Sequence, residues 1–573
     1  MKAVLKQTAF AVMIMLLVVM VACSGNNGSD SNADTNSKTT ADSSHTSNTG
    51  TSTSNTDNAD NSSTVAAPLG KYKPPIEITT GRSIPEGTVF ADGENIDDNV
   101  WTKEEQENLG IKVKNVWTVP GALYDQKLNV TIASGDIPDF MRVNGAQLNN
   151  LVESDLIEDL TDILPKYSSD ILTKTIAEDP YAIKSATFDG KLMAIPLPGS
   201  PAMGASNLWV REDWLEKLNL QDPQTLDDVL AIAKAFVEND PDGNGAQDTF
   251  GLGLTKDLWG GLASLEGFFS AFHQYPTIWV TDESGKAAFG GIQPEIKTVL
   301  LKLQQMYKSG MIDTEFGVKD SGKVAESIAS NQIGLFYGSW WNPYYPLQDA
   351  LNKNPTMRWK HIALVSTDSQ QALSPGNFTT SGYYVVRKGA EHPEAIVKMA
   401  NYLLTKYYVN NEVVSLQGKY SGIAVWNYPS LWIEPPTKNV AIQQRIKKAL
   451  ESQDESTLTP DEINNLTLQR QYTDGGDVKQ WAQFGAFGPD GSLDLVQQII
   501  DNDLVKQTLF NSAPTPTMVE KMSALNKLQL ETYTKIIMGV SSADDFDKFV
   551  SDWKKFGGDK ITQEVNDWYA KNQ

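Results

Sequence analysis

Cysteine and histidine are nearly absent from this sequence, which has one cysteine and four histidines among 573 residues. A single cysteine allows no internal disulfide and no metal site built from several thiolates. The histidines are scattered along the chain, and none lies beside a Ser or Cys nucleophile motif. Gly-x-Ser-x-Gly, His-Glu-x-x-His and the Walker-type phosphate loop are also missing. These absences argue against most nucleophilic, zinc-dependent and nucleotide-dependent enzymes. They leave open a glycoside hydrolase, for which two carboxylates suffice.

Basic residues are also in deficit. Lysine and arginine total 48 against 71 aspartate and glutamate residues, so the net charge is −23 and the pI is about 4.7. A surface this acidic repels phosphate backbones, which argues against nucleic acid as a partner. It also disfavours a strongly anionic ligand, unless a local basic pocket outweighs the negative potential of the surface as a whole. No internal repeat is visible, which argues against solenoids and propellers.

The N-terminus has the order of a secretory signal. Lys2 and Lys6 precede an apolar run at residues 9–21 that is too short for a comfortable bilayer span. Small residues and then Cys23 follow, and this Met-Val-Ala-Cys ending resembles a bacterial lipobox. We predict a signal peptide at 1–22 and a diacylglycerol on Cys23, which anchors the protein to the extracellular face of a bacterial cell membrane. The alternatives are an uncleaved anchor and an ordinary signal peptide with an incidental cysteine.

Residues 23–70 are predicted to form the lipidated cysteine and a disordered tether. This stretch consists mainly of Ser, Thr, Asn, Asp and Gly, with almost no apolar side chains. Such a segment cannot bury enough surface to offset its ordering entropy. About 500 residues remain, which is enough for two large lobes with a core each.

Beyond the tether, short apolar strands alternate with amphipathic helical stretches, which is the pattern of an α/β protein. The predicted strands are 112–119, 140–143, and 185–188 with 192–195 as a hairpin around the Asp189-Gly190 turn. The predicted helices are 123–133, 225–237 with a capping pair at its start, 393–404, and a C-terminal series from 518 onward divided at Gly539 and Gly557-Gly558.

A calcium loop is the sharpest chemical signal. Oxygen-bearing residues recur at positions 1, 3, 5, 7 and 9 of an EF-hand pattern, namely Asp240, Asp242, Asn244, Ala246 through its carbonyl, and Asp248. Gly245 supplies the sharp turn, but Gly251 replaces the bidentate Glu at position 12, so Thr249 or another group must complete the coordination. We predict a structural Ca²⁺ here. The alternative is a polar turn after a helix.

Tryptophan is the second signal. Seven tryptophans of the latter two-thirds are candidates, and several of them lie beside Gly, Asn or Pro in apparent loops: Trp259, Trp279, Trp340, Trp341, Trp426, Trp432 and Trp481. A flat indole covers the C–H face of a sugar ring while polar side chains satisfy its hydroxyl rim. Core packing is the alternative for each, and we favour it for Trp214 and Trp553. The Trp340-Trp341 pair is a stacking candidate because two adjacent indoles do not both fit comfortably inside a core.

At this point the chain resembles the extracellular solute-binding lipoproteins of sugar ABC importers, including the alginate-oligosaccharide-binding proteins. The stretches that carry the resemblance are 133–139 (ASGDIPD), 208–218 (LWVREDWLEKL), 225–226 with 240–245 (DPDGNG), 392–395 (HPEA), 514–517 (PTPT), and 553–558 (WKKFGG) with 565–566. The resemblance implies a two-lobed periplasmic-binding-protein-like fold, with an interlobe cleft, a multi-strand hinge and a calcium loop away from the ligand. We expect lobe 1 at 71–204 and about 378–430, and lobe 2 at 205–377 and about 431–573.

The expected function is a non-enzymatic, monomeric receptor that captures a carbohydrate and delivers it to an ABC permease. Closure of the lobes on the ligand would be a population shift that requires contacts to both lobes. The expected ligand contacts are Ser134, Gly135, Asp136, Asp189, Trp259, Trp340, Trp341, Tyr383 and Trp426. The alternatives are a lipid-anchored glycoside hydrolase with paired carboxylates and a surface adhesin.

Overall fold

The computed structural model describes residues 67–409 and 427–572. The predicted signal peptide, Cys23, most of the tether and Trp426 lie outside the described residues. Within the described ranges, no helix combines the length and the apolar character that crossing a bilayer requires.

The first sheet contains five strands in the order β2-β1-β3-β15-β6. Their bounds are β1 (Ile76–Ile84), β2 (Ile111–Pro120), β3 (Phe140–Val143), β6 (Ile195–Pro196) and β15 (Tyr383–Val386). β1 pairs parallel with both β2 and β3, whereas β15 runs antiparallel to β3 and β6. Three parallel strands therefore end at one edge of this sheet, and the antiparallel β15 begins there.

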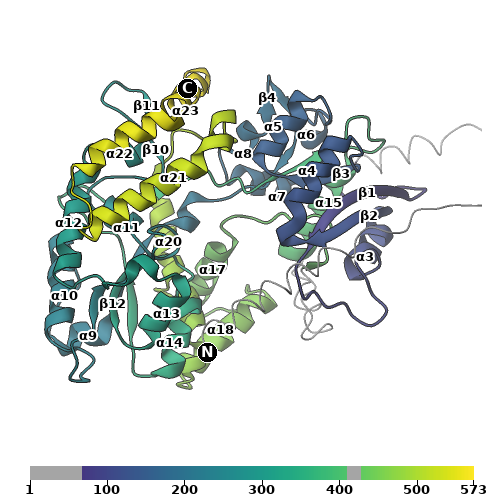
Figure 1. Cartoon of the computed structure of the whole chain (residues 1–573). Helices are drawn as coiled ribbons and strands as arrows, with labels where there is room; N and C mark the ends of the chain where they lie inside the picture. Colours follow the sequence, from purple (N-terminus) through teal and green to yellow (C-terminus); the bar gives the residue numbers. More distant parts are fainter. Residues whose placement is uncertain (1–66, 410–426, 573) are drawn as a thin grey trace, which may run out of the picture. The chain divides into compact units, whose positions relative to one another are not determined.

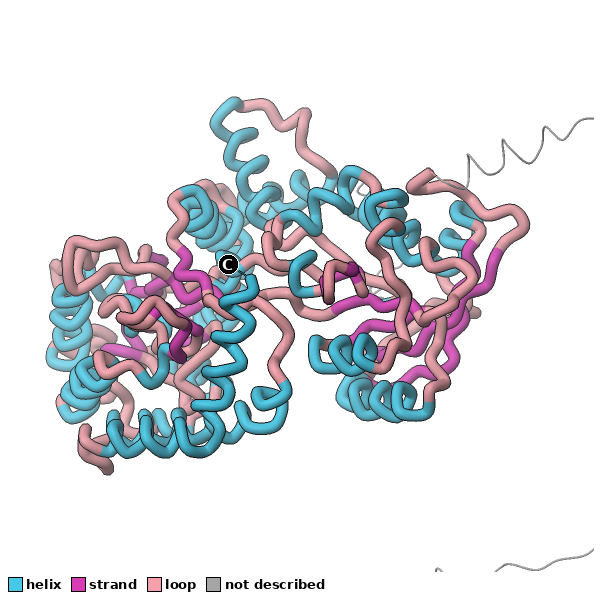
Figure 2. Tube along the Cα trace, turned by 90° about the horizontal axis from the view of Figure 1, so that it is seen from above, coloured by secondary structure: helices cyan, strands magenta, loops and turns pink. Residues whose placement is uncertain are grey.

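Helices flank this sheet and complete the first core (Figures 1 and 2). They are α3 (Val100–Leu109), α4 (Tyr124–Ser134), α5 (Gly145–Glu153), α6 (Ile163–Tyr167), α7 (Asp170–Ala177), α8 (Ala182–Ser185) and α15 (Ala395–Leu404). α4 packs on β1 and β2, and α15 packs on α3, α6 and α7. The buried side chains of this core come from residues 72–197 and 383–433.

The second sheet has the strand order β13-β7-β12-β8, and β9 also pairs with β12. Its strands are β7 (Asn207–Arg211), β8 (Phe250–Leu252), β9 (Leu262–Ser264), β12 (Ile333–Gly338) and β13 (Trp359–Ile362). The other strands of the described residues form three two-stranded sheets: β4 (Thr187–Phe188) with β5 (Lys191–Leu192), β10 (Trp279–Thr281) with β11 (Ala287–Phe289), and β14 (Ser374–Gly376) with β16 (Val505–Gln507).

A longer series of helices accompanies the second sheet (Figure 1). They are α9 (Glu212–Lys217), α10 (Leu226–Glu238), α11 (Glu266–Ser270), α12 (Ile296–Lys308), α13 (Ser321–Ala329), α14 (Gln348–Lys353), α17 (Lys438–Ser452), α18 (Pro460–Thr473), α19 (Trp481–Phe487), α20 (Ser492–Asp501), α21 (Pro516–Ile537), α22 (Asp545–Trp553) and α23 (Asp559–Asn572). The largest core of this part combines buried residues from 208–372 with residues from 510–565.

Most local expectations from the sequence agree with this structure, but the strands predicted at 185–188 and 192–195 are wrong in extent, because residue 185 ends α8 and residues 192–195 run from the end of β5 to the start of β6 in another sheet. The strand predicted at 140–143 is β3, and the helix predicted at 225–237 is α10, which Thr225 and Asp228 begin with a capping box. The Asp189-Gly190 turn joins the paired strands β4 and β5, although each is only two residues long. Trp214 and Trp553 are both buried, as expected for core residues.

Candidate ligand-binding site

A pocket of about 560 Å³ lies at the edge of the first sheet where the three parallel strands end. The residues that line it are Thr80, Gly81, Arg82, Ser83, Pro85, Gly121, Tyr124, Asp125, Arg142, Val143, Asn144, Ser381, Tyr384, Asn427, Pro429, Ser430 and Trp432. We call it the strand-end pocket. Ligands of open α/β sheets bind outside the carboxyl ends of the strands, where the strand order reverses. The β2-β1-β3 order places such a reversal at β1.

Arg82, near the end of β1, holds the wall of this pocket together. Its guanidinium donates to two successive carbonyls, through Nη1 to Tyr428 and through Nη2 to Asn427, both at 2.7 Å. The side chain is buried, and this burial lowers the pKa of Arg82. The two segments that it joins are more than 340 residues apart in sequence.

Glu105 on α3 is a buried acid whose carboxyl group interacts electrostatically with Arg82. Its exposed fraction is 5%, and one of its carboxylate oxygens has no hydrogen-bond partner among the described residues. Burial raises the pKa of Glu105 to about 8, and the Arg82 charge opposes this rise. The carboxyl group is therefore protonated over most of the neutral range.

Aromatic side chains form the other part of the wall. The Tyr384 hydroxyl accepts a hydrogen bond from the backbone N–H of Trp432 at 2.8 Å, and the Tyr124 hydroxyl donates to the Arg142 carbonyl at 2.7 Å. Trp432 is half-buried and packs edge-on against Tyr407, with ring centroids 5.0 Å apart. A partly exposed indole beside hydroxyl and guanidinium groups is suited to a ligand with both apolar faces and polar rims.

The residues predicted from the 133–139 motif lie elsewhere on the same sheet. α4 starts at the carboxyl end of β2 and ends near the amino end of β3, so Ser134, Gly135 and Asp136 lie at the edge opposite the strand-end pocket. They are exposed, and Ser134 and Asp136 line a separate pocket of about 560 Å³ with Trp117 and Lys127. Ligand contact by these residues stays a prediction.

Two other predicted contacts of this half also lie outside the strand-end pocket. Asp189 is exposed in the β4–β5 turn. Tyr383 is 1% exposed, and its hydroxyl donates to Ser185 Oγ at 3.0 Å. Alternate side chains of a strand point to opposite faces, so its neighbour Tyr384 reaches the pocket while Tyr383 packs in the core.

The predicted tryptophans of the second half are partly brought together. Trp259 is half-buried against Phe269 and Tyr533. The Trp341 ring packs against the backbone of Gly261, so closely that a Cβ added to this glycine would lie 2.5 Å from the ring. Trp341 and its neighbour Trp340 are both half-buried but pack on different clusters. Neither indole is fully buried, which agrees with the expectation that the pair does not fit in one core.

Backbone strain surrounds this tryptophan group. Leu258 and Ala263 are non-glycine residues with positive φ angles of 62° and 49°, and both are fully buried. Such conformations cost free energy and persist where the surrounding structure imposes them. Between them, the Gly260 N–H donates to the Glu266 carboxylate, and burial raises the pKa of Glu266.

The predicted calcium loop is a self-bonded polar turn. Asp240 accepts hydrogen bonds from the Gly245 and Gly243 N–H groups at 3.0 and 3.1 Å, and the Asn244 amide nitrogen contacts Asp242 at 2.8 Å and Asp248 at 3.1 Å. A hydrogen bond from Asp242 lowers the pKa of Asp240, while burial and that bond raise the pKa of Asp242. Among the described residues, no three His, Cys, Asp or Glu side chains are arranged as a metal site.

The donor chemistry of the loop nevertheless fits a hard cation. The amide of Asn244 lies between two carboxylates, and a half-turn of that amide presents its oxygen instead of its nitrogen. Position 12 is closed to a side chain, because a Cβ on Gly251 would lie 2.6 Å from the Ala233 carbonyl oxygen. The Thr249 hydroxyl is buried and donates to the Phe236 carbonyl at 2.7 Å.

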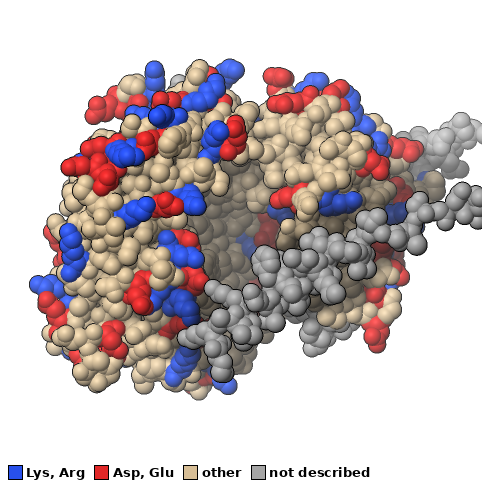
Figure 3. All heavy atoms as spheres, in the orientation of Figure 1, with Lys and Arg blue, Asp and Glu red and all other residues tan. Residues whose placement is uncertain are grey.

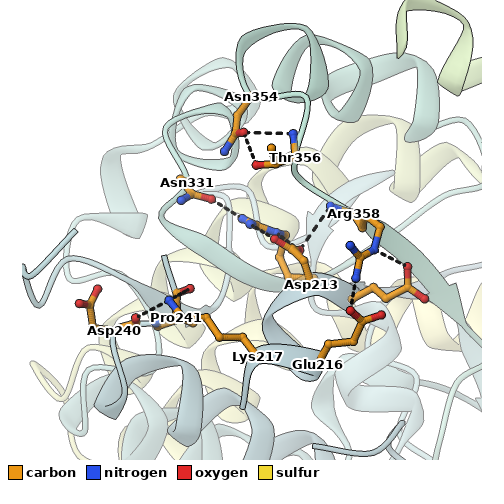
Figure 4. Close-up of polar contacts among 11 residues, drawn as sticks. Asp213, Glu216, Lys217, Asp240, Pro241, Asn331, Asn354, Thr356 and Arg358 are labelled. Carbon is orange, nitrogen blue, oxygen red and sulfur yellow. Dashed lines mark hydrogen bonds and ion pairs between the residues drawn. The ribbon is translucent and has the colours of Figure 1, made fainter. Parts of the chain in front are cut away.

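α9 holds this loop from outside (Figure 4). Lys217 Nζ donates to the Pro241 carbonyl at 2.8 Å. On the same helix, Glu216 forms an ion pair with Arg358. Just before the helix, the buried Arg211 binds Asp213 in a bidentate pair. The 208–218 motif therefore anchors the loop to the second sheet.

Sequence reasoning missed most residues of the strand-end pocket. It noted Trp432 as one of seven candidate tryptophans, but it singled out neither Arg82 nor Tyr384. Arg142 carried a readable signal, because it interrupts the apolar strand Phe140–Val143 near its carboxyl end. Ser430 and Asn427 carried none, since only the tertiary structure brings them to this edge.

The family model for bacterial extracellular solute-binding proteins matches residues 101–421, which is more than half of the chain. The chain belongs to this family. Among curated proteins, this solute-binding protein is 24% identical to lipoprotein LipO of Bacillus subtilis, over 82% of the chain and 89% of LipO. It is 27% identical to the polygalacturonan/rhamnogalacturonan-binding protein YtcQ of the same species, over 41% of the chain and 46% of YtcQ.

Solved structures confirm the α/β solute-binding fold. The HMO binding ABC-transporter associated solute binding protein of Bifidobacterium longum infantis matches 86% of the chain and 98% of its own length, with a TM-score of 0.59 and 17% identity. Alginate-binding protein AlgQ2 without calcium ion and an EF-hand mutant of FusA from S. pneumoniae with fructo-nystose each match with a TM-score of 0.54 and 16% identity. Each covers 87% of this chain and 99% of its own.

Proposed function

We propose that this solute-binding protein captures an oligosaccharide outside the cell and delivers it, as a monomer, to an ABC-type permease. The observation that carries the proposal is the strand-end pocket, which sets the half-buried Trp432 beside the Tyr384 and Arg142 side chains. An indole for the apolar face of a sugar and hydrogen-bonding groups for its hydroxyls are what such a ligand requires. The descriptions of YtcQ, FusA and the Bifidobacterium protein as sugar-binding or transporter-associated proteins support it.

A glycoside hydrolase is less consistent with this pocket. Retaining and inverting glycosidases place two carboxyl groups on either side of the scissile bond. Among the described residues that line the strand-end pocket, Asp125 is the only carboxylate. The family to which the chain belongs is one of ligand-binding proteins. We therefore propose binding without turnover, with the lobe boundaries expected from the sequence.

Trp432→Ala is expected to weaken oligosaccharide binding by about thirtyfold or more, because loss of an aromatic anchor often costs about 2 kcal/mol. A thermal-shift screen first identifies a ligand, and calorimetry then measures the affinity of the variant. Trp432→Phe keeps a flat ring and should lose less. Trp341→Ala tests the platform predicted from the sequence in the same assay. Native affinity of Trp432→Ala together with weak binding by Trp341→Ala would move the site to the second sheet.

We further propose a structural Ca²⁺ on the loop 240–248, held by Asp240, Asp242, Asn244, Asp248 and the Ala246 carbonyl. The oxygen donors and the amide between two carboxylates support this site. The calcium and EF-hand wording attached to the AlgQ2 and FusA structures agrees with it. Its role would be to rigidify the turn after α10.

Chelation is expected to lower the melting temperature of the protein. Mass action gives about 2.7 kcal/mol of stabilisation when free Ca²⁺ is a hundredfold above its dissociation constant. Asp242→Ala should remove most of this response. Asp282→Ala, in the exposed turn between β10 and β11, should retain it. Melting curves that do not respond to Ca²⁺ or chelator would identify the loop as a turn only.

We also propose that Cys23 carries the lipid anchor and that residues 23–70 act as the tether on the extracellular face of the membrane. The lipobox-like order of residues 20–23 supports the anchor. The description of LipO as a lipoprotein supports it as well.

A further inference from the structure

The strand-end pocket differs in charge from the rest of the protein. The net charge of the chain is −23, and acidic and basic side chains are interspersed over the face seen in Figure 3. Among the described residues that line this pocket, Arg82 and Arg142 face a single carboxylate, Asp125. The Asp125 carboxylate already accepts a hydrogen bond from the Gln147 amide at 3.3 Å. The net charge of the side chains that line the pocket is therefore positive.

Arg142 is the group that can reach a ligand. Its side chain is exposed, and Nη2 makes one long hydrogen bond, 3.3 Å, to the Ser381 carbonyl. No other hydrogen bond from this guanidinium is formed within the described residues. Arg82, in contrast, uses both Nη atoms on backbone carbonyls and contributes its charge rather than its donors. A planar guanidinium with free N–H groups matches a carboxylate in a bidentate pair.

Two helices add to this field. α4 begins at Tyr124, and α5 begins directly after Asn144, so both N-termini lie at the pocket. The N-terminus of a helix carries a partial positive charge that favours anions. A buried hydroxyl group is a second, independent indication that a ligand binds in this pocket. Ser430 is 7% exposed, lines the pocket, and its Oγ has no hydrogen-bond partner among the described residues.

We infer that the ligand of the strand-end pocket is an acidic oligosaccharide, whose uronate carboxylate pairs with Arg142 while Trp432 covers a ring face. This inference rests on the proposed function and specifies its substrate class. A carboxylate there meets a guanidinium, the charge of Arg82 and two helix N-termini. A neutral sugar would leave the Arg142 charge without a partner. The acidic surface elsewhere would repel the ligand, so recognition depends on this local reversal of charge.

The test compares acidic oligosaccharides with neutral partners of the same backbone, using the whole mature protein. Calorimetry measures the affinity for trigalacturonate and, in a separate titration, for its methyl ester. Glucuronate- and mannuronate-containing oligosaccharides are each compared with their methyl esters in the same way. An acid is expected to bind about tenfold or more tightly than its neutral partner, because hydrogen bonds to a charged group are the stronger ones. Its affinity should fall as salt is raised, since a partly exposed charge pair is screened.

Two arginine variants refine the test. Arg142→Gln should weaken binding of the acid about tenfold more than it weakens binding of the neutral partner, because only the acid loses a charge pair. Arg142→Lys, which keeps the charge, should recover part of that difference. Arg470→Gln on α18 is the matched control, because this arginine is exposed and lies outside the pocket lining. It removes the same charge and should leave both affinities unchanged.

Neutral oligosaccharides that bind as tightly as their acids, or that bind alone, overturn this inference and leave the proposed function standing. Equal losses in Arg142→Gln and Arg470→Gln also overturn it, because the effect is then one of net charge. If no oligosaccharide binds, the proposed function fails as well.

Discussion

Glu105→Gln is expected to raise the melting temperature by several degrees at pH 9 and to leave it nearly unchanged at pH 5. Glu105 is buried on α3, and burial raises its pKa to about 8 despite the nearby Arg82 charge. Above that pH, the native protein has to bury an ionised carboxylate, one oxygen of which has no hydrogen-bond donor among the described residues. This cost destabilises the folded state relative to the unfolded chain. Glutamine has the same shape and carries no charge, so the variant avoids this cost.

The direction of the pH dependence follows from the two protonation states. In the unfolded chain, Glu105 releases its proton near the ordinary value of about 4.5, whereas the folded protein keeps it up to about 8. The stabilisation from the bound proton is therefore complete below pH 4.5 and is lost as the pH rises through 8. Its size is on the order of 3–5 kcal/mol. Denaturant unfolding of both proteins between pH 4 and pH 9 measures it.

Glu107→Gln is the control for this prediction. Glu107 lies on the same helix but is exposed, so its replacement should leave the pH dependence of the wild-type protein intact. Parallel stability curves for the wild-type protein and Glu105→Gln across this range would contradict the prediction.

Arg82→Met is expected to reduce the free energy of unfolding by about 2–5 kcal/mol, because it leaves two backbone carbonyls without their donors, and each unsatisfied buried polar group costs about 1–3 kcal/mol. The Asn427 and Tyr428 carbonyls lose the donors that bind them at 2.7 Å. The Tyr428 hydroxyl also ties this segment to the Val89 carbonyl, so both flanks of the pocket wall are affected. Ligand affinity should fall with stability, since this segment carries Trp432.

Arg358→Met is the matched control for this loss. Arg358 is half-exposed and pairs with Glu216 and Glu212 at the surface, where an ion pair contributes about 0–1 kcal/mol. Chemical denaturation of both variants at one pH gives the comparison. A loss of under about 1 kcal/mol in Arg82→Met would show that the guanidinium does not hold the wall.

The sequence by itself determined the features that depend on near neighbours. The hydrophobic pattern predicted β3 and α10, and the Thr225–Asp228 cap and the Asp189-Gly190 turn lie where their side chains predicted. Helical spacing placed Trp214 and Trp553 in cores. Ordered motifs along the chain indicated the solute-binding family, which the family model confirms. These signals survive in a single sequence because the groups that cause them are a few residues apart.

Only the tertiary structure decided which residues share the strand-end pocket. Arg82, Arg142, Tyr384 and Trp432 come from segments tens to hundreds of residues apart, and the β2-β1-β3-β15 order brings them to one edge. Periodicity shows which face of a strand is buried, but it does not show which strand lies beside it or which end of the sheet a loop reaches. For that reason the conspicuous 133–139 motif led to the opposite edge of the sheet from Arg82, whose buried partners are two distant backbone carbonyls.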